Sequence, residues 1–589
     1  MAQVPSPAAQ DGGDPRAASG WLGRLQTDLE WGFDRGLAWA SSNPWRAALV
    51  IGLVALAVIL PGISALPVTD RDEARFAQAT KQMLETGNFV DIRFQDAPRW
   101  KKPAGIYWLQ AGAAGLAGGA EAPIWAYRLP SALGVLAAAV LMVWALKPVV
   151  GRAAATLAGV MVATCLLAIG EANIAKTDAA LLATAVVVLG VLARMALDPP
   201  DAPPLAWTVV LAGWGAAGIA VLLKGPIVPA IALLALGALW AAHRKTPRLG
   251  RLRPLPGLAL MLAIALPWLV AIWMVSGGAF FEESVGRDLI GKVREGQEAH
   301  WGPPGLYLLL IWGTMWPWAA LLPQAAPWLW AQRREAWLLL LAAWTVPFWV
   351  VLEAVPTKLP HYVLPLYPAL LAAVAAWALA ADKPVAGPRL RWASALLVAV
   401  PGFGLALAIP ALPLALEGRL LPIGVALGAL GAAGTLLAFR AALAARPRAQ
   451  IAASLCAVVP IAWGALQVGL PALDTVFPSP RIAAAAAPWM PCASGPLVTA
   501  GYREPSMVFM TDTATLLATP PEAARVIAEE PGTLMLLEDR WKRFMAAYAP
   551  LPDDLVERAR LEYFNYNRGD YETAALVTRA DPRWDACAR

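Results

Sequence analysis

Residues 46–66 read RAALVIGLVALAVILPGISAL, a run that carries a single charge. A helix that crosses the hydrocarbon core of a bilayer needs about 20 predominantly apolar residues. Similar apolar runs recur at short spacing as far as residue 470, and 59% of the 589 residues are hydrophobic while 15% are charged. A water-soluble protein of this length could not bury so much apolar surface. The sequence therefore predicts a polytopic α-helical membrane protein.

The apolar runs predict about 13 membrane-spanning helices. We expect them at 46–66, 124–146, 153–170, 178–196, 206–222, 226–242, 255–275, 304–322, 335–354, 361–381, 392–412, 420–441 and 450–470. The segment 104–119 is apolar but short for a span and rich in Gly and Ala. We expect it to be a re-entrant or membrane-surface helix.

The distribution of Lys and Arg between the loops predicts the orientation of these helices. One set of alternate short loops carries most of the cations: Arg244, Lys245, Arg248, Arg251, Arg253, Arg333, Arg334, Lys383, Arg389, Arg391, Arg440, Arg446 and Arg448. The opposite short loops hold only isolated cations: Lys176, Lys224, Lys358 and Arg419. Since cation-rich loops stay in the cytoplasm, the loops 67–103 and 277–303 and the region 471–589 are expected on the periplasmic side of a bacterial inner membrane.

Three regions follow from this topology. Residues 1–45 form a partly disordered cytoplasmic tail, residues 46–470 the transmembrane domain, and residues 471–589 a small periplasmic α/β domain. In the last region 497–500, 533–537 and 574–578 resemble buried strands, and 521–530 and 539–548 resemble helices. Cys492 and Cys587 flank this region and could pair in an oxidising compartment. The net charge of +6 is modest and no basic stripe with interleaved aromatics appears, so no nucleic-acid partner is expected.

The loop 67–103 begins with Thr-Asp-Arg-Asp-Glu-Ala-Arg-Phe at 69–76. Thr69 and Asp72 have the spacing of a capping box, and the apolar positions that follow predict an amphipathic surface helix over 71–86. Acids at a helix N-terminus also complement the helix dipole, so this spacing alone does not establish a catalytic role.

Single charged residues recur at the outer ends of the predicted helices. Asp178 stands at the membrane edge of an apolar helix, where a carboxylate is costly and marks a functional site by default. Lys224 and Lys358 occupy tight turns at the same depth, and Lys101 and Lys102 precede the segment 104–119. Each cation alone could be an interfacial anchor. Together they suit a phosphate carried by a lipid and a hydroxyl nucleophile.

The order of these motifs resembles the membrane glycosyltransferases of the GT-C type that include the aminoarabinose–lipid A transferases and, more distantly, the protein O-mannosyltransferases. The motifs are Asp72-Glu73-Ala74-Arg75-Phe76, Lys102-Pro103 with Tyr107-Trp108-Leu109, Arg128-Leu129-Pro130-Ser131, Lys176-Thr177-Asp178, Lys224-Gly225-Pro226, Lys358-Leu359-Pro360-His361-Tyr362 and, late in the chain, Phe564-Asn565-Tyr566 with Arg568-Gly569. The resemblance covers residues 45–370 by motif, and the outer C-terminal domain also fits.

The resemblance implies an inverting transfer of a sugar from a polyprenyl-phosphate donor to lipid A, another glycan or a protein at the periplasmic face. It implies catalytic roles for Asp72 and Asp178. The residues expected at the donor phosphate are Arg75, Lys102, Lys224 and Lys358. Those expected along the substrate groove are Glu73, Tyr107, Arg128, His361 and Tyr362.

The sequence departs from the family pattern at Lys101, where members often carry an acid that, with a histidine, holds a metal. A divalent metal is the one cofactor that the resemblance raises, with His300 as its candidate ligand. The cation at position 101 argues against that site.

Two rival functions share some of these features. A transporter or lipid-linked-sugar flippase would have as many helices, but such proteins usually show paired repeats and charges near the middle of the membrane. A ligase or polymerase of surface polysaccharide would share the lipid donor but requires a different loop layout. Here the notable charges gather at one face, which favours a transferase.

Overall fold

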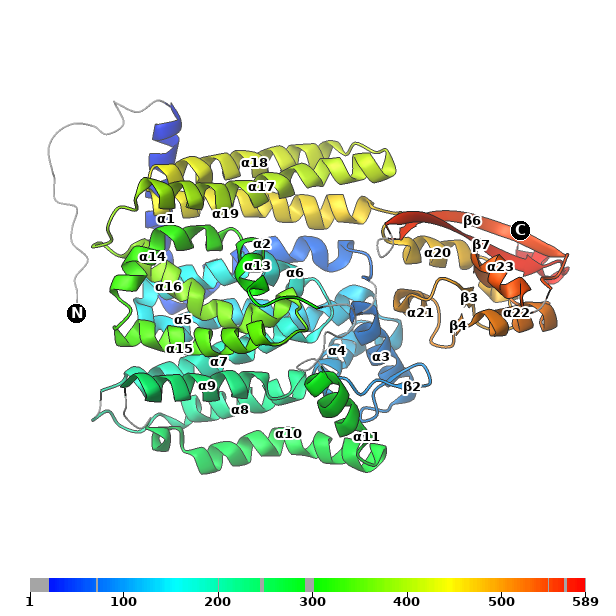
Figure 1. The fold of residues 1–589 in the computed structure, drawn as a ribbon, viewed down its shortest axis with the longest axis horizontal. Helices are drawn as coiled ribbons and strands as arrows, with labels where there is room; N and C mark the ends of the chain where they lie inside the picture. The colour runs from blue at the N-terminus through cyan, green and yellow to red at the C-terminus, as the bar shows by residue number, and fades with distance from the viewer. Residues whose placement is uncertain are drawn as a thin grey trace.

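The computed structural model describes residues 21–69, 72–199, 201–243, 248–291, 301–548, 550–565 and 569–587. Long helices run side by side through most of the molecule, and a small domain containing a β-sheet extends from one end of the bundle (Figure 1). The predicted class, a polytopic helical membrane protein with a small C-terminal α/β domain, is confirmed.

Ten helical segments among the described residues are long and apolar enough to cross a membrane. They are α2 (Pro44–Ala65), α5 (Ile124–Ala163), α7 (Thr177–Leu197), α8 (Trp207–Lys224), α10 (Pro254–Ser276), α15 (Ala336–Ala354), Pro360–Leu379 with α16 (Tyr367–Leu379), α17 (Pro388–Glu417), α18 (Pro422–Leu443) and Pro447–Ala472 with α19 (Pro447–Trp463). A bent pair, α13 (Leu306–Thr314) followed by Trp318–Ala331 with α14 (Leu322–Ala331), makes an eleventh if counted as one span.

With the bent pair included, the total of 11 is two lower than the expected 13, and the difference arises at two places in the chain. The expected spans 124–146 and 153–170 belong largely to α5, a single assigned helix of 40 residues that is interrupted at Gly151 (φ 80°, ψ 165°). Such a length is about 60 Å, twice the hydrocarbon thickness, and the positive φ at Gly151 breaks the helix between two crossings. The other place is α9 (Ile227–His243), whose 17 residues lie at the lower limit for a span.

Short helices cover the end of the bundle that faces the C-terminal domain. Helix α3 (Asp72–Thr86) confirms the helix predicted in the first loop, and a hairpin of β1 (Arg93–Phe94) and β2 (Ala97–Pro98) follows it. Helix α4 (Gly105–Leu116) has 12 residues, about 18 Å, which is too short to cross. Figure 1 shows α3, α4, β2 and α11 (Ala279–Phe281) together at this end.

Two glycines allow helices to approach closely beside this end. A Cβ on Gly134 of α5 would lie 2.5 Å from the carbonyl oxygen of Ala179, in the first turn of α7. A Cβ on Gly105 of α4 would lie 2.7 Å from the carbonyl oxygen of Leu222, in the last turn of α8. Small residues at helix contacts permit this spacing in membrane proteins. Both contacts fix helix ends that carry candidate site residues.

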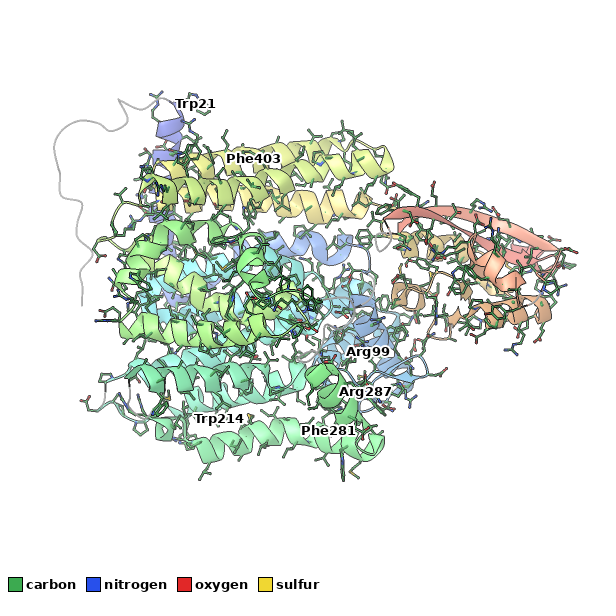
Figure 2. The ribbon with its side chains drawn as sticks, in the orientation of Figure 1. Trp21, Arg99, Trp214, Phe281, Arg287 and Phe403 are labelled. Atoms are coloured by element: carbon green, nitrogen blue, oxygen red, sulfur yellow. A yellow bond between two sulfur atoms is a disulfide. The ribbon has the colours of Figure 1, made fainter. Side chains whose placement is uncertain are left out.

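The opposite end of the bundle holds α1 (Trp21–Ser41), which occupies part of the expected cytoplasmic tail. Arg446 and Arg448 at the start of α19 form ion pairs with Glu30 and Asp34 of α1. Residues 1–20 lie outside the described residues. Apolar side chains also lie on the outer surface of the bundle. Phe403 on α17, for example, is 40% exposed where lipid would contact it (Figure 2).

The C-terminal domain contains a five-stranded mixed sheet in the order β4-β3-β5-β7-β6. The sequence predicted β3 (Val498–Ala500), β5 (Met535–Glu538), part of β7 (Asp570–Arg579), α22 (Pro520–Glu529) and α23 (Trp541–Ala546). It missed β4 (Leu516–Ala518), β6 (Leu555–Asn565) and the short helices α20 (Pro478–Ala486), α21 (Pro505–Met510) and α24 (Arg583–Cys587). Cys492 and Cys587, whose pairing the sequence left open, form a disulfide with a Cα–Cα distance of 6.3 Å.

Candidate active site

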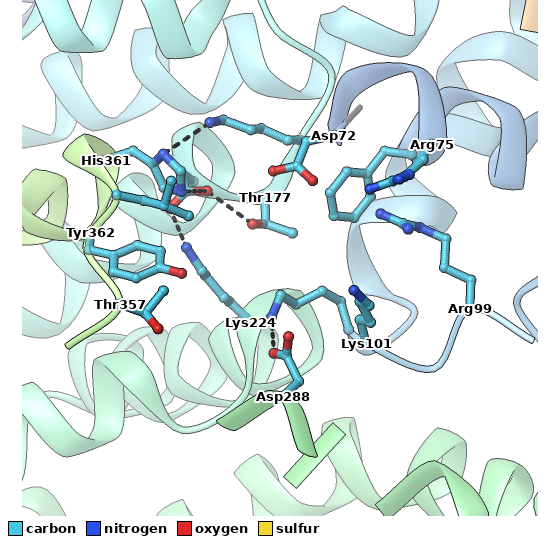
Figure 3. A pocket seen from close by; sticks show the side chains of 15 residues that line it. Asp72, Arg75, Arg99, Lys101, Thr177, Lys224, Asp288, Thr357, His361 and Tyr362 are labelled. Carbon is cyan, nitrogen blue, oxygen red and sulfur yellow. Dashed lines mark hydrogen bonds and ion pairs between the residues drawn. The ribbon is translucent and has the colours of Figure 1, made fainter. Parts of the chain in front are cut away.

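A pocket opens at the end of the bundle that carries α3 and α4 (Figure 3). Its cavity volume is about 70 Å³, and its lining comes from segments far apart in the sequence. The lining residues are Asp72, Arg75, Phe76, Arg99, Lys101, Lys102, Lys176, Thr177, Asp178, Lys224, Asp288, Thr357, Leu359, His361 and Tyr362. Six Lys or Arg residues face three carboxylates, so the pocket carries a surplus of positive charge suited to an anionic ligand.

Asp178 lies in the first turn of α7, where a carboxylate complements the positive end of the helix dipole. Its Oδ1 forms an ion pair with Lys224, the last residue of α8. Its Oδ2 accepts a hydrogen bond from Thr177 (3.2 Å) and lies 3.7 Å from Nε2 of His361. Gly225, with φ 71°, ends α8 immediately after Lys224. The local turns thus bring the predicted Asp178, Lys224 and His361 together.

A second buried acid, Glu171 of α6 (Leu166–Ala172), stands behind this group. Its Oε1 is 2.8 Å from Nζ of Lys176, and that Nζ is 3.2 Å from Nδ1 of His361. A lysine ammonium can only donate, so Nδ1 accepts and the neutral imidazole carries its proton on Nε2, facing Asp178. Within the described part of the chain, Oε2 of Glu171 has no hydrogen-bond partner.

Burial gives Glu171 unusual titration behaviour. Desolvation raises its pKa to about 7, although the neighbouring Lys176 acts in the opposite direction. For Lys176, burial would lower the pKa, but Glu171 and Asp178 more than offset this effect and the pKa is raised. The ammonium of Lys176 therefore stays charged over the range in which Glu171 exchanges its proton.

Helix α3 presents Asp72 and Arg75 to the pocket from the opposite side (Figure 3). Asp72 is solvent-exposed, and its carboxylate has no hydrogen bond or ion pair with any other described residue. Arg99 lies over the ring of Phe76 at 4.9 Å from the centroid. Asp72 is therefore available to a substrate hydroxyl, whereas Asp178 is already engaged by Lys224.

Lys102, expected at the donor phosphate, reaches the pocket and pairs with Asp288 at 2.7 Å. Asp288 belongs to the π-helical segment Glu282–Ile290 and was missed by the sequence analysis, as were Glu171 and Arg99. The sequence predicted that all three lie in segments at this end of the bundle. It did not show which residues they would contact. Tyr362 is also in the pocket, with Nζ of Lys224 4.9 Å from its ring centroid.

Glu73 and Arg128, both expected along the substrate groove, are instead a buried structural pair. Arg128 is fully buried, donates to both carboxylate oxygens of Glu73 at 2.7 and 2.9 Å, and donates to three backbone carbonyl oxygens. The guanidinium lowers the pKa of Glu73, against the effect of burial. Thr69 donates its N–H and hydroxyl to Glu73, so Glu73 rather than Asp72 completes the cap of α3.

Lys358 was expected at the donor phosphate, but its ammonium points away from the pocket lining. Nζ donates to the carbonyl oxygens of Leu352, Glu353 and Val355, at distances of 2.7–2.9 Å. It therefore caps the C-terminal end of α15, where a cation is favourable. Tyr107, expected in the groove, is fully buried behind Phe76 with ring centroids 5.3 Å apart.

The metal prediction stays a prediction, since His300 lies outside the described residues. Among the residues described, no group of three or more His, Cys, Asp or Glu side chains could hold a metal. Lys101 adds a cation to the pocket lining, which opposes a divalent ion there.

The chain is similar to known membrane proteins of one kind. A family model described as dolichyl-phosphate-mannose-protein mannosyltransferase matches residues 48–276. An undecaprenyl phosphate-alpha-4-amino-4-deoxy-L-arabinose arabinosyl transferase of Erwinia tasmaniensis is 27% identical over 328 residues, which cover 55% of this chain and 57% of the relative. The corresponding transferase of Pectobacterium carotovorum subsp. carotovorum is 27% identical over 401 residues, covering 64% and 69%.

Solved structures show the same fold over nearly the whole chain. ArnT from Cupriavidus metallidurans in the apo state superposes with a TM-score of 0.67 at 19% identity and covers 90% of this chain and 97% of its own. ArnT from the same organism bound to undecaprenyl phosphate gives 0.67 at 20% identity, with 90% and 98% covered. The chain is therefore similar in sequence to the dolichyl-phosphate-mannose-protein mannosyltransferases over residues 48–276 and to the aminoarabinose transferases over 55–64% of its length, and it shares the fold of ArnT.

Proposed function

We propose that this protein transfers a sugar from a polyprenyl-phosphate donor to an acceptor hydroxyl or phosphate. The observation that carries the proposal is the pocket in which six cations surround Asp72 and Asp178. A lipid-linked donor would place its phosphate at the membrane surface, within reach of Lys102, Lys224 and Arg75. The names of the relatives support an undecaprenyl phosphate carrier.

The reaction is an inverting displacement. The acceptor oxygen attacks the anomeric carbon, the bond from that carbon to the phosphate oxygen breaks, and the polyprenyl phosphate leaves with the electron pair. Asp72, which has no partner among the described residues, accepts or orients the acceptor proton, an effect of about 10²–10⁴-fold for general-base catalysis. Lysines and arginines stabilise the negative charge that develops on the leaving phosphate.

Asp178 acts on the donor side of this reaction. Its ion pair with Lys224 holds that ammonium in the pocket, and the hydrogen bond from Lys176 to His361 directs the imidazole Nε2–H towards Asp178. Fixed cations aimed at the phosphate cost no reorganisation during the reaction, which is the source of their catalytic effect. Asp178 therefore positions the donor, and Asp72 serves the acceptor.

The cation distribution in the loops supports a periplasmic site in a bacterial inner membrane. Lipid A, another glycan or a protein at that face is the acceptor. The decisive experiment compares the wild type with Asp72→Asn, using purified protein and a membrane extract that contains polyprenyl-phosphate sugars. Mass spectrometry follows loss of sugar from the donor and gain of sugar on lipid A. Asp96→Asn is the matched control, since Asp96 is an exposed acid of the same loop outside the pocket.

The wild type and Asp96→Asn are expected to transfer sugar, and Asp72→Asn to lose activity while it keeps the wild-type melting temperature. A product on lipid A names both the sugar and the acceptor. Consumption of donor with unchanged lipid A assigns another glycan or a protein as the acceptor. If the wild type consumes no donor from a complete lipid extract, the proposal is wrong.

A further inference from the structure

A second crevice lies at the end of the bundle opposite the candidate active site. Its lining comes from the start of α2, the middle of α5 and the last turn of α7, and comprises Pro44, Trp45, Ala48, Val140, Leu141, Val143, Trp144, Lys147, Arg152 and Arg194. Asp178 and Arg194 are 16 residues apart on α7, a rise of about 24 Å. The two sites therefore face opposite sides of the membrane.

The crevice is positively charged at its polar end. Lys147, Arg152 and Arg194 line it, and no Asp or Glu is among its described lining residues. Arg194 lies over the ring of Trp144 at 4.2 Å and donates to backbone carbonyl oxygens, and Arg152 donates to the carbonyl oxygen of Ser42 at 2.9 Å. These hydrogen-bond partners are neutral, and Asp198, four residues after Arg194, forms its ion pair with Arg251 at 2.8 Å.

The remainder of the crevice is apolar and open towards the surrounding lipid. Seven of its ten lining residues are Pro, Trp, Ala, Val or Leu, and its cavity volume is about 390 Å³, within the range that small ligands fill. Trp45 is 82% exposed beside it. Exposed tryptophans of membrane proteins prefer the level of the lipid headgroups. The opening therefore lies where a lipid headgroup and the first part of its acyl chains meet the protein.

We propose that this crevice binds one phospholipid with an anionic headgroup from the cytoplasmic leaflet. The headgroup phosphate contacts Lys147 and Arg152, and the acyl chains lie along Val140, Leu141 and Ala48. Basic pockets between transmembrane helices on the cytoplasmic side are suited to anionic lipids. This site is independent of sugar transfer, because none of its residues lines the candidate active site.

Lys147 offers the cleanest test. Its side chain is exposed, and it makes no hydrogen bond or ion pair with other described residues, so its substitution leaves the fold intact. The protein is reconstituted in nanodiscs of phosphatidylcholine that contain about 20 mole per cent phosphatidylglycerol. It is then released into detergent, and native mass spectrometry counts the lipids that each protein molecule retains. Lys147→Gln and Lys147→Glu are compared with Arg389→Glu, a charge reversal on an exposed residue of the same membrane face outside the crevice.

The wild type and Arg389→Glu are expected to retain one phosphatidylglycerol in preference to phosphatidylcholine. Loss of one cation weakens retention about fivefold, and charge reversal weakens it more. Equal retention by Lys147→Glu and the wild type would overturn the proposal. So would retention of phosphatidylcholine to the same extent, which would show an apolar crevice without headgroup selectivity. A second variant, Arg152→Gln, is expected to repeat the loss if its melting temperature in detergent is unchanged.

Discussion

Two acid–base pairs lie at the same end of the helix bundle and are built differently. In the Glu73–Arg128 pair both side chains are fully buried, and the guanidinium is saturated by carboxylate and backbone oxygens. In the Asp178–Lys224 pair both side chains line an open pocket that contains further cations. A saturated pair has no capacity left for a substrate, whereas a pair in a pocket lining that holds six cations and three carboxylates does. Hydrogen-bond saturation therefore separates the structural pair from the candidate catalytic one.

The largest loss of stability is expected when the buried Glu73–Arg128 pair is broken. Glu73→Gln or Arg128→Met leaves a buried charge without its partner, which costs about 3–5 kcal/mol of folding free energy. Thermal unfolding in detergent measures this loss. The double variant Glu73→Gln with Arg128→Met should recover part of the stability, because it removes both charges. Wild-type stability in the single variants, with lost activity, would instead assign the pair to the site.

Asp178→Asn is expected to act on the reaction rather than on the fold. Lys224 would no longer be fixed towards the donor phosphate, so sugar transfer should fall about 10²–10³-fold, as when one preorganised electrostatic group is removed. The melting temperature should fall less than in Glu73→Gln, although Asp178 is itself buried, because Lys224 keeps its place in the pocket lining beside other polar groups. Asp201→Asn, an exposed acid beyond the far end of α7, is the control and should retain full activity. A large loss of stability in Asp178→Asn would contradict the distinction.

The sequence identified Asp178 and Lys224 as separate site residues, but not their ion pair, because an acid at the edge of an apolar helix and a cation at the end of the next one stand out in the pattern. It could not distinguish Lys224 from Lys358, since both are lone cations in turns at the same depth. Only the fold shows that the ammonium of Lys358 is used by carbonyl groups of α15. Glu171 and Asp288 were missed for the same reason: their partners are set by tertiary contacts.

The C-terminal domain shows a similar limit. Short apolar strands such as β5 were predicted because they are buried along their whole length. Strand β6 contains Glu557, Arg558, Arg560 and Glu562 and lies at the edge of the sheet, so its charges obscured the strand pattern. Residues on an exposed sheet edge are under weaker hydrophobic constraint than those of a central strand.

Glu171 makes stability depend on pH near neutrality, whereas the lowered pKa of Glu73 affects stability only at acid pH. The pKa of Glu171 is about 7 in the folded protein and near 4.5 when unfolded, so the folded state binds the proton more tightly. Its contribution to stability is therefore full below pH 4.5 and is lost as the pH rises towards 7, by about 3 kcal/mol at most. Unfolding measured from pH 4.5 to 8 should show this loss in the wild type and a smaller slope in Glu171→Gln. Equal slopes would show that Glu171 does not titrate in this range.

The smallest of these effects is expected at Lys358. Lys358→Met removes a cation that accompanies the last carbonyl groups of α15, at a cost of about 1–2 kcal/mol. The readout is a modest fall in melting temperature at unchanged KM for the donor. A raised KM at unchanged stability would show that Lys358 contacts the donor phosphate. Hydrogen-bond saturation would then fail to separate structural cations from those of the site.

The central claim concerns which cations hold the donor phosphate. They are the cations that line the pocket, such as Lys224, and not cations whose hydrogen bonds are all made to the protein's own carbonyl groups, such as Lys358. Equilibrium binding of undecaprenyl phosphate to the wild type, Lys224→Met and Lys358→Met tests this claim most directly, since each variant removes one cation of the same kind. We expect binding to weaken about tenfold or more in Lys224→Met and by less than about twofold in Lys358→Met. Equal weakening in both variants, or weakening in Lys358→Met alone, would contradict the claim.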